Sequence, residues 1–227
     1  IVASNGDVWY AGNRTALIGR YDPSDGSIEE IPMPDPKARE PHTLIFDADE
    51  SRIWFPVQGG NMMGRLRLAD RKVDLIASTT ARSRPYGSKL APDGSVWVAL
   101  FDTSKLAHID PETMQHTEID LPRDDARPRR LEVLADGTVW YVDYAGGMRG
   151  KYDPSTAEFT EWQMPQGEQA RPYGMASDGQ GRLWMVATGV QPNVFMGFDP
   201  VAGEFIEQTE VGSGGGTIRH MHYHAAT

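Results

Sequence analysis

The sequence contains no cysteine among its 227 residues, which excludes disulfide bonds and thiolate metal sites. It also lacks an excess of basic charge. Its 22 lysine and arginine residues stand against 32 acidic ones, and a net charge of −10 repels the phosphate backbone of nucleic acids. No apolar run approaches the roughly 18–20 residues that a membrane span needs. The chain begins at Ile1 without a charged-then-apolar leader, so any targeting signal would lie upstream. We therefore expect a soluble protein of undefined compartment that binds neither nucleic acid nor membrane.

Tryptophan recurs at an almost constant interval, inside short runs of β-forming residues. The spacings of 45, 43, 43 and 44 residues separate Trp9, Trp54, Trp97, Trp140 and Trp184. Ten residues after each of the first four comes a small residue, which predicts close approach by a bulky side chain, expected to be the tryptophan ring: Gly19, Gly64, Ala107 and Gly150. An interval of about 40–45 residues is typical of one propeller blade.

Turn-forming residues divide each interval into four short strands. In the fourth repeat the β-like runs span 128–135, 138–142, 148–152 and 158–163, and Asp136-Gly137 is a strong hairpin signal. Pairs such as Asp153-Pro154 end the third strand, because proline fixes φ and removes a hydrogen-bond donor. The sequence therefore predicts an all-β fold, a β-propeller of four-stranded antiparallel blades.

About five blades are present, in one expected propeller domain. Their approximate bounds are 1–37, 38–81, 82–124, 125–168 and 169–213, with the start of another blade at 214–227. Residues 1–4 and 217–224 resemble innermost strands. A closed five-bladed ring would use 217–224 to complete the first blade. We favour an incomplete seven-bladed propeller, because 217–224 lacks its hairpin partner. Such a fragment exposes two blade faces, which predicts poor stability or self-association.

Each innermost strand begins with a three-residue segment, the start motif, whose middle residue is proline in four of five repeats. In a propeller these motifs meet at one mouth of the central channel. Histidine, tyrosine and arginine bind anions, stack on rings and move protons. We expect a shared site, the alternative being ordinary polar lining of a wet channel. The last residues of the motifs, the start positions, differ from blade to blade: His42, Tyr86, Arg129, Tyr173 and Arg219.

Two further positions at the ends of the tryptophan strands, Gln58 and Asp143, would reach the same mouth, with turn capping as the alternative. The tail places His220, His222 and His224 on one face of the expected strand. Such a spacing suits a zinc site or histidines packed between blades. His220, which follows Arg219, is counted with the expected substrate-binding residues.

Several of these segments together resemble the virginiamycin B lyase family, also called streptogramin B lyases. The resemblance extends over essentially the whole chain, and its most specific part combines the Pro-His or Pro-Tyr-Gly start motif with Ile-Gly-Arg and Asp-Pro. It rests on Trp9-Tyr10, Ile18-Gly19-Arg20-Tyr21-Asp22-Pro23, Pro41-His42, Pro85-Tyr86-Gly87 and Gly214-Gly215-Gly216-Thr217-Ile218-Arg219-His220-Met221.

The resemblance implies a monomeric seven-bladed propeller that linearises a cyclic depsipeptide antibiotic by elimination. A base removes an α-proton, the threonyl C–O bond breaks, and no water is consumed. The family uses Mg²⁺ to stabilise the enolate-like oxygen, and a histidine after the proline of a start motif as the base. His42 matches that histidine. Gln58 stands where the family has an acidic metal partner, so no metal ligand is assigned.

Two other functions remain open on the residues alone. The first is a non-enzymatic propeller whose arginine and tyrosine side chains bind an anionic or aromatic ligand. The second and less favoured is a calcium-dependent lactonase. That chemistry needs several carboxylates or asparagines, and the start positions supply none.

Overall fold

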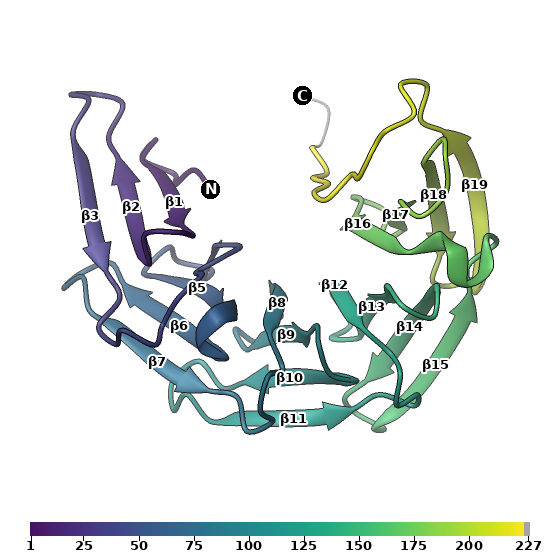
Figure 1. Ribbon diagram of the computed structural model, residues 1–227, viewed down its shortest axis with the longest axis horizontal. Coiled ribbons are helices and arrows are strands. Elements are labelled where there is room, and N and C mark those ends of the chain that lie inside the picture. Colours follow the sequence, from purple (N-terminus) through teal and green to yellow (C-terminus); the bar gives the residue numbers. More distant parts are fainter. Residues whose placement is uncertain (225–227) are drawn as a thin grey trace. The chain divides into compact units, whose positions relative to one another are not determined.

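The computed structural model describes residues 1–224, which form five antiparallel β-sheets (Figure 1). The first has three strands and the others have four, and within every sheet the strands are neighbours in chain order. In the described residues no helix is long and apolar enough to cross a membrane. The two short helices are of the 3₁₀ type, η1 (Gln58–Gly60) and η2 (Gly167–Ala170).

The strands of each sheet follow one another from the inside of the blade outward. Sheet 1 contains β1 (Val8–Gly12), β2 (Leu17–Tyr21) and β3 (Ile28–Pro32). Sheet 2 contains β4 (Ile45–Phe46), β5 (Arg52–Val57), β6 (Met62–Arg67) and β7 (Val73–Ala77). Sheet 3 contains β8 (Pro85–Leu90), β9 (Val96–Leu100), β10 (Lys105–Ile109) and β11 (His116–Asp120). Sheet 4 contains β12 (Pro128–Val133), β13 (Val139–Asp143), β14 (Met148–Asp153) and β15 (Glu158–Gln163). Sheet 5 contains β16 (Pro172–Ser177), β17 (Leu183–Ala187), β18 (Val194–Asp199) and β19 (Glu204–Glu210).

The chain divides into two compact units, which are described separately. Unit 1 comprises Ile1–Leu90, Gly94–Asp102 and Leu106–Ile119, and unit 2 comprises Ala91–Asp93, Thr103–Lys105 and the residues from Asp120 onward. Sheets 1 and 2 belong to unit 1, and sheets 4 and 5 belong to unit 2. The four-stranded pattern predicted from the sequence is confirmed, and in sheet 4 the observed strands differ from the predicted ones by at most two residues.

A small residue in the third strand of a blade makes room for a large side chain on the second strand. Gly64 lies opposite Phe55, and Gly150 lies opposite Tyr141. A Cβ atom at either glycine would collide with that ring. The neighbour is therefore the residue after the tryptophan, and the expectation that the tryptophan ring fills this space is wrong for these two sheets. The tryptophan side chain points to the opposite face, because successive residues of a strand alternate.

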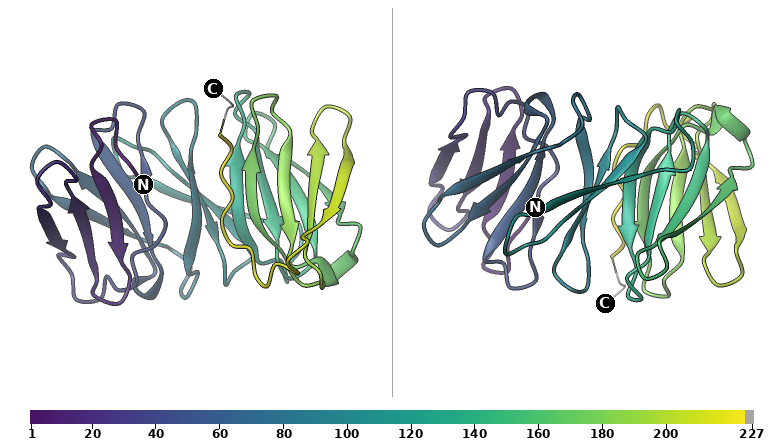
Figure 2. Two further views of the ribbon diagram at one scale, coloured as in Figure 1. Left: turned by 90° about the horizontal axis from the view of Figure 1, so that it is seen from above. Right: turned by 90° about the horizontal axis from the view of Figure 1, so that it is seen from below.

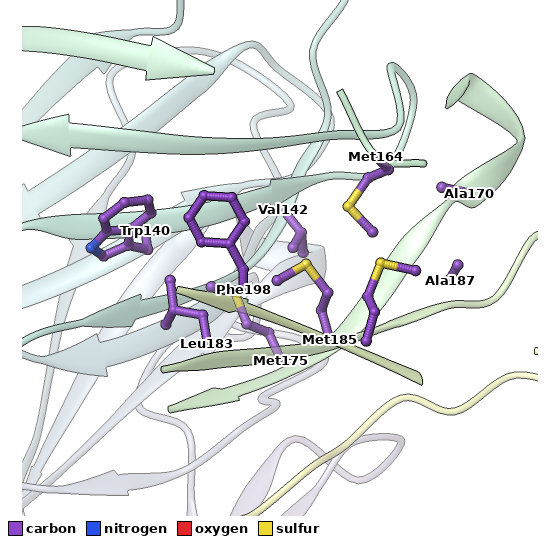
Figure 3. Packing of buried hydrophobic residues seen from close by; sticks show 10 residues of the cluster. Trp140, Val142, Met164, Ala170, Met175, Leu183, Met185, Ala187 and Phe198 are labelled. Atoms are coloured by element: carbon purple, nitrogen blue, oxygen red, sulfur yellow. The ribbon is translucent and has the colours of Figure 1, made fainter. Parts of the chain in front are cut away.

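The core consists of layers between neighbouring sheets. In unit 2, Trp140 of sheet 4 packs with Phe198, Leu183 and Met185 of sheet 5 (Figure 3). Arg149 is fully buried in the same layer, with its guanidinium over the rings of Trp140, Trp162 and Phe198, all in unit 2.

The two ends of the described chain behave differently. Residues 1–2 pair with β1 as expected, through the antiparallel bridge of Val2 with Val8. The tail 217–224 forms no strand, so that prediction is wrong. It still runs beside β16, where the Gly174 N–H donates to the Ile218 carbonyl at 3.3 Å (Figure 2). Only this one backbone bond to β16 is present in the described residues, and Gly214, Gly215 and Gly216 all have positive φ before it.

Candidate functional site

The start motifs are held by one backbone hydrogen bond that recurs in four sheets. The residue four positions after each tryptophan donates its N–H to the carbonyl of the residue before the proline. The pairs are Gln58 to Glu40, Phe101 to Arg84, Tyr144 to Arg127 and Thr188 to Arg171, with lengths of 3.0, 3.2, 3.0 and 3.4 Å. Glu40, Arg84 and Arg171 have positive φ, although side-chain-bearing residues seldom adopt this conformation. The frame thus fixes each start position without using its side chain.

In unit 1 this frame brings three rings together. His42 lies against Tyr86 with ring centroids 4.8 Å apart, and Tyr86 lies 5.6 Å from Phe101. The Nδ1 atom of His42 is 2.9 Å from the Thr43 hydroxyl. When Nδ1 donates to that hydroxyl, Nε2 carries the lone pair that a general base needs. His42 is half-buried, whereas Tyr86 is buried, so the imidazole is the more accessible member of the group.

Gln58 is buried at the first position of η1, at the same end of sheet 2 as His42. Its backbone belongs to the frame, since its N–H bonds Glu40. Its side-chain Nε2 is buried and has no hydrogen-bond partner within the described residues. An unsatisfied buried amide costs free energy, so Gln58 is a position where a polar ligand or a water molecule would be stabilised.

In unit 2 the corresponding positions carry positive charge against aromatic rings. The Arg129 guanidinium carbon lies 3.5 Å from the ring centroid of Tyr173 and 4.3 Å from that of Tyr144. The two tyrosine rings meet edge to face at 6.4 Å. Tyr173 is buried and Arg129 is half-buried, so the arginine covers the ring and presents its outer edge to solvent. This arrangement suits an anion or a planar group.

The tail adds a histidine to this cluster. A nitrogen of Arg130, the residue after Arg129, lies 3.1 Å from Nε2 of His220. Burial together with the charges of Arg130 and Arg219 lowers the pKa of His220 below its usual value. In its neutral form His220 would accept a hydrogen bond from Arg130. Arg219 is exposed.

Asp143 is a buried loop cap rather than part of this surface. Its carboxylate accepts the N–H groups of Arg127, Ala145 and Gly146 at 2.7, 3.0 and 3.1 Å, and it also pairs with Arg123. Its side chain is fully buried. The turn-capping alternative therefore describes Asp143. The residue that corresponds to Gln58 is Tyr144, which was not among the predicted site residues, and neither was Arg130. Counting four residues on from Trp140 would have found Tyr144.

The side chains around His42 do not fit Mg²⁺. Magnesium prefers carboxylate and water oxygens, whereas Thr43, Gln58 and Tyr86 offer neutral groups. Across residues 1–224 no three His, Asp or Glu side chains come together as a metal site, and this includes His220, His222 and His224. We therefore assign no ligand to the expected magnesium ion, which stays a prediction from the resemblance.

Two hollows lie where neighbouring sheets meet, and both follow from the packing of the blades. One of about 480 Å³ lies between sheets 4 and 5 and includes Trp140 and Lys151. The other, of about 420 Å³, lies between sheets 1 and 2 and includes Trp9 and Arg20. Each pair consists of a blade tryptophan and the cationic residue eleven positions later. Because the same hollow recurs where two sheets meet, it belongs to blade packing.

The comparison with known families gives one match, and it covers part of the chain. The model of the virginiamycin B lyase family matches residues 1–109, which include His42, Gln58 and Tyr86. No curated protein sequence matches this chain.

Solved structures resemble the chain over a greater length. Virginiamycin B lyase from Staphylococcus aureus aligns with all of this chain and 73% of its own, at a TM-score of 0.89 and 21% identity. A catalytically inactive His-to-Ala variant of that enzyme, solved with quinupristin, gives 0.86 and 20% over the same shares. A streptogramin B lyase aligns over 93% of this chain and 67% of its own, at 0.82 and 23%.

Proteins with other activities share the fold at lower similarity. A 6-phosphogluconolactonase candidate from Bacteroides fragilis aligns over 93% of this chain and 70% of its own, with a TM-score of 0.67 and 14% identity. At such identities the structures establish a fold and no activity. The predicted blades of a β-propeller are confirmed, and the chain resembles the virginiamycin B lyase family, by its sequence over residues 1–109 and by its fold throughout.

Proposed function

We propose that this chain is part of a virginiamycin B lyase-like enzyme, a carbon–oxygen lyase that opens a streptogramin B-type cyclic depsipeptide. The observation that carries the proposal is the placement of His42, within the segment that the family model matches, on a start position with its ring fixed by Thr43 and Tyr86. Such an activity would inactivate the antibiotic and so confer resistance.

The reaction balances without water. Nε2 of His42 takes the proton from the α-carbon of the esterified threonine. The electron pair of the broken Cα–H bond forms the Cα–Cβ double bond. The Cβ–O bond breaks, and the ester oxygen leaves as part of a carboxylate. The Thr43 hydroxyl, 2.9 Å from Nδ1, stabilises the imidazolium that results. A histidine suits this step because its pKa lies near neutrality.

The protein also has to bind the substrate through aromatic and charged side chains. Among the predicted substrate-binding residues, Arg129 and Tyr173 form the best-defined pair, and Arg219 and His220 lie on the tail of the same unit. Tyr86 fixes His42, and Gln58 offers a buried amide. Magnesium stays a prediction from the resemblance. It is tested by adding Mg²⁺ or a chelator to each assay.

Quinupristin incubated with the protein tests the proposal. Elimination leaves the mass unchanged, whereas hydrolysis adds the mass of one water. The product of elimination is therefore recognised by a changed retention time and a linear fragmentation pattern at the original mass. His42→Ala should abolish the product. His222→Ala removes an exposed tail histidine and serves as the matched control. Intact cyclic quinupristin after incubation with the folded wild-type chain would reject the lyase.

A non-enzymatic binding propeller is the second candidate, favoured by the Arg129 stack between Tyr144 and Tyr173. It predicts that quinupristin, or a small anionic or aromatic compound, binds without being converted. Calorimetry then gives binding that Arg129→Ala weakens about tenfold, as expected for loss of a charged hydrogen bond to the ligand of about 1.5 kcal/mol. Under this hypothesis His42→Ala changes the affinity only slightly.

A further inference from the structure

Two start motifs are held by a side chain in addition to the backbone frame. In unit 1 the Arg84 N–H donates to Oδ1 of Asn61 at 3.2 Å, and the Ser83 hydroxyl donates to the same oxygen at 2.7 Å. In unit 2 the Arg127 N–H donates to the Asp143 carboxylate at 2.7 Å. The first residue of each motif therefore has its carbonyl fixed by the frame and its N–H fixed by a side chain.

Each of these side chains is held in turn by the segment that leads into the blade. Nδ2 of Asn61 donates to the Thr80 carbonyl at 2.9 Å, and Asp143 accepts a hydrogen bond from Arg123. Thr80 and Arg123 occupy the same place in the repeat, five residues before the proline of the start motif. The two units therefore use equivalent positions for this second link.

A glutamate of the outer strand binds each of these segments. Glu118 of β11 accepts the Thr80 N–H at 3.0 Å and also the Thr80 hydroxyl. Glu161 of β15 accepts Nε of Arg123 at 3.0 Å. Each glutamate comes 21 residues after the tryptophan of its blade, and the side chains are only 6% and 12% exposed. We call these two series of hydrogen bonds the anchor chains, formed by Glu118, Thr80, Asn61 and Arg84 in unit 1, and by Glu161, Arg123, Asp143 and Arg127 in unit 2.

The anchor chain of unit 1 begins with a charged acceptor. Burial would raise the pKa of Glu118, but the hydrogen bonds from Thr80 lower it below its usual value. An ionised acceptor makes these bonds stronger than bonds between neutral groups. Sheet 2 forms without such a chain, because the apolar Leu75 and Pro36 hold the corresponding two positions. A blade therefore does not need an anchor chain in order to fold.

The anchor chain of unit 1 ends two residues before Tyr86. Arg84 has a φ of +53°, a conformation that a residue with a side chain keeps only when its surroundings fix it. Pro85 then restricts the backbone between Arg84 and Tyr86. The Tyr86 ring lies against His42, with centroids 4.8 Å apart. Loss of the hydrogen bond to the Arg84 N–H would therefore displace the ring on which the imidazole rests.

We propose that Glu118 is a positioning residue for His42, because its anchor chain fixes the ring of Tyr86. This inference deepens the proposed function and rests on it, since His42 is the base of that reaction. The anchor chain of Glu161 ends instead two residues before Arg129, which is assigned to substrate binding. Loss of the two glutamates should therefore change different kinetic constants.

Steady-state kinetics with quinupristin and the 227-residue protein tests the proposal. Glu118→Ala should lower kcat about 10–10²-fold and change KM little, because a small displacement of a base slows the chemical step. Glu118→Gln keeps an acceptor for Thr80 and should recover most of the loss. Glu161→Ala should raise KM by up to about tenfold and change kcat little. Equal losses of kcat in the two alanine variants, or a wild-type kcat in Glu118→Ala, would overturn the proposal.

The residue before each glutamate gives a matched control. Thr117 and Thr160 are exposed on the same outer strands, so Thr117→Ala and Thr160→Ala should keep wild-type kinetics. Urea unfolding checks that each variant is folded under the assay conditions. If Glu118→Ala does not fold, Asn61→Gly breaks the same chain at its next link. Asn61 has a positive φ, which glycine adopts without strain, so this variant should fold and should lose kcat in the same way.

Nuclear magnetic resonance separates this inference from the lyase activity. The imidazole C–H signals of His42 report the position of Tyr86, because an aromatic ring shifts the resonances of nuclei beside it, and His42→Ala identifies them by their loss. Glu118→Ala should move these signals, whereas Thr117→Ala should not. A wild-type chain that leaves quinupristin intact rejects the proposed function, and moved signals then still support the positioning role. Unmoved signals in folded Glu118→Ala would overturn that role whatever the activity.

Discussion

The two units place different chemistry on the same frame. In unit 1 the start positions of sheets 2 and 3 carry a histidine and a tyrosine ring, with His42 against Tyr86. In unit 2 the start position of sheet 4 carries Arg129, packed on Tyr173 of sheet 5. The backbone bond that holds these segments has the same donor and acceptor positions in both units. The difference teaches that chemical identity at these sites is set by one side chain, while position is set by the backbone.

The contrast continues into the core. At the position nine residues after the tryptophan, unit 1 has the apolar Ile18, Met63 and Leu106, all buried. Unit 2 has Arg149 there in sheet 4. Unit 2 thus places a guanidinium against aromatic rings at two depths, half-exposed at Arg129 and buried at Arg149. The first suits a ligand, and the second has a cost in stability.

The largest expected effect separates catalysis from binding. If the lyase proposal holds, His42→Ala should lower kcat about 10²–10⁴-fold, the range typical of a lost general base. Arg129→Ala should raise KM for quinupristin about tenfold and change kcat little, because it removes a charged group that binds the substrate. Steady-state kinetics of both variants gives the comparison. Equal losses in kcat for the two would contradict the division between the units.

The next effect concerns the loop cap. Asp143→Ala should destabilise the protein by about 2–3 kcal/mol, because three backbone N–H groups and Arg123 lose a charged acceptor. Urea unfolding at pH 7 measures the change in the free energy of unfolding. Leu100 holds the corresponding place in sheet 3, so Leu100→Ala gives the cost of emptying this position where no cap exists. An Asp143→Ala variant of wild-type stability would contradict the capping role.

Replacement of the buried Arg149 should raise the stability of the protein rather than lower it. Arg149→Met should stabilise unit 2 by about 1–3 kcal/mol, because an unpaired buried cation is replaced by an apolar side chain of similar volume. The reciprocal change in unit 1, Met63→Arg, should destabilise by a similar amount or more. Burial lowers the pKa of Arg149 to about 8, in line with the cost of keeping this charge out of water. Thermal unfolding of the two variants tests the pair, and a destabilised Arg149→Met would reverse the interpretation.

The smallest effect is the contribution of His116, in unit 1, to the pH dependence of stability. Both ring nitrogens of His116 are buried without hydrogen-bond partners in the described chain, and burial lowers the pKa of its imidazole. The unfolded chain therefore binds the proton at higher pH than the folded one. The free energy of unfolding is at its full value above about pH 6.5 and falls as the pH drops from there toward the folded pKa. His116→Gln should remove this slope, by no more than about 1 kcal/mol, in urea unfolding between about pH 5 and pH 7.

The repeating parts of the fold were predictable because they follow from local sterics. Trp54, Trp97 and Trp140 at a constant interval, and glycine where a ring must pass, are readable in a single sequence. The strand predicted at 217–224 does not form, because a strand needs a ladder of hydrogen bonds to a neighbour. In the described residues this segment makes a single backbone hydrogen bond to β16. Its three preceding glycines, at positive φ, turn the chain without extending it into a strand.

The site was predictable only in part. The start positions follow from the proline motif, so His42 and Arg129 could be found from the sequence. Asp143 was predicted to belong to the site because it is charged. It lies one residue before Tyr144, and a shift of one residue along a strand turns the side chain to the other face. The half-buried Tyr144 lies against Arg129 instead. The contact of Arg130 with His220 joins residues 90 positions apart, and no local pattern indicates it.

The backbone bond between the pre-proline carbonyl and the residue after the tryptophan strand has a consequence for evolution and design. Since neither partner contributes a side chain, the intervening start position can be exchanged without rebuilding the loop. Glu40, Arg84 and Arg171 already tolerate a left-handed backbone, and glycine at these three places would relieve a strain of about 1 kcal/mol each. A library that varies only the half-buried start positions His42 and Arg129 would therefore sample new specificities on an unchanged backbone frame.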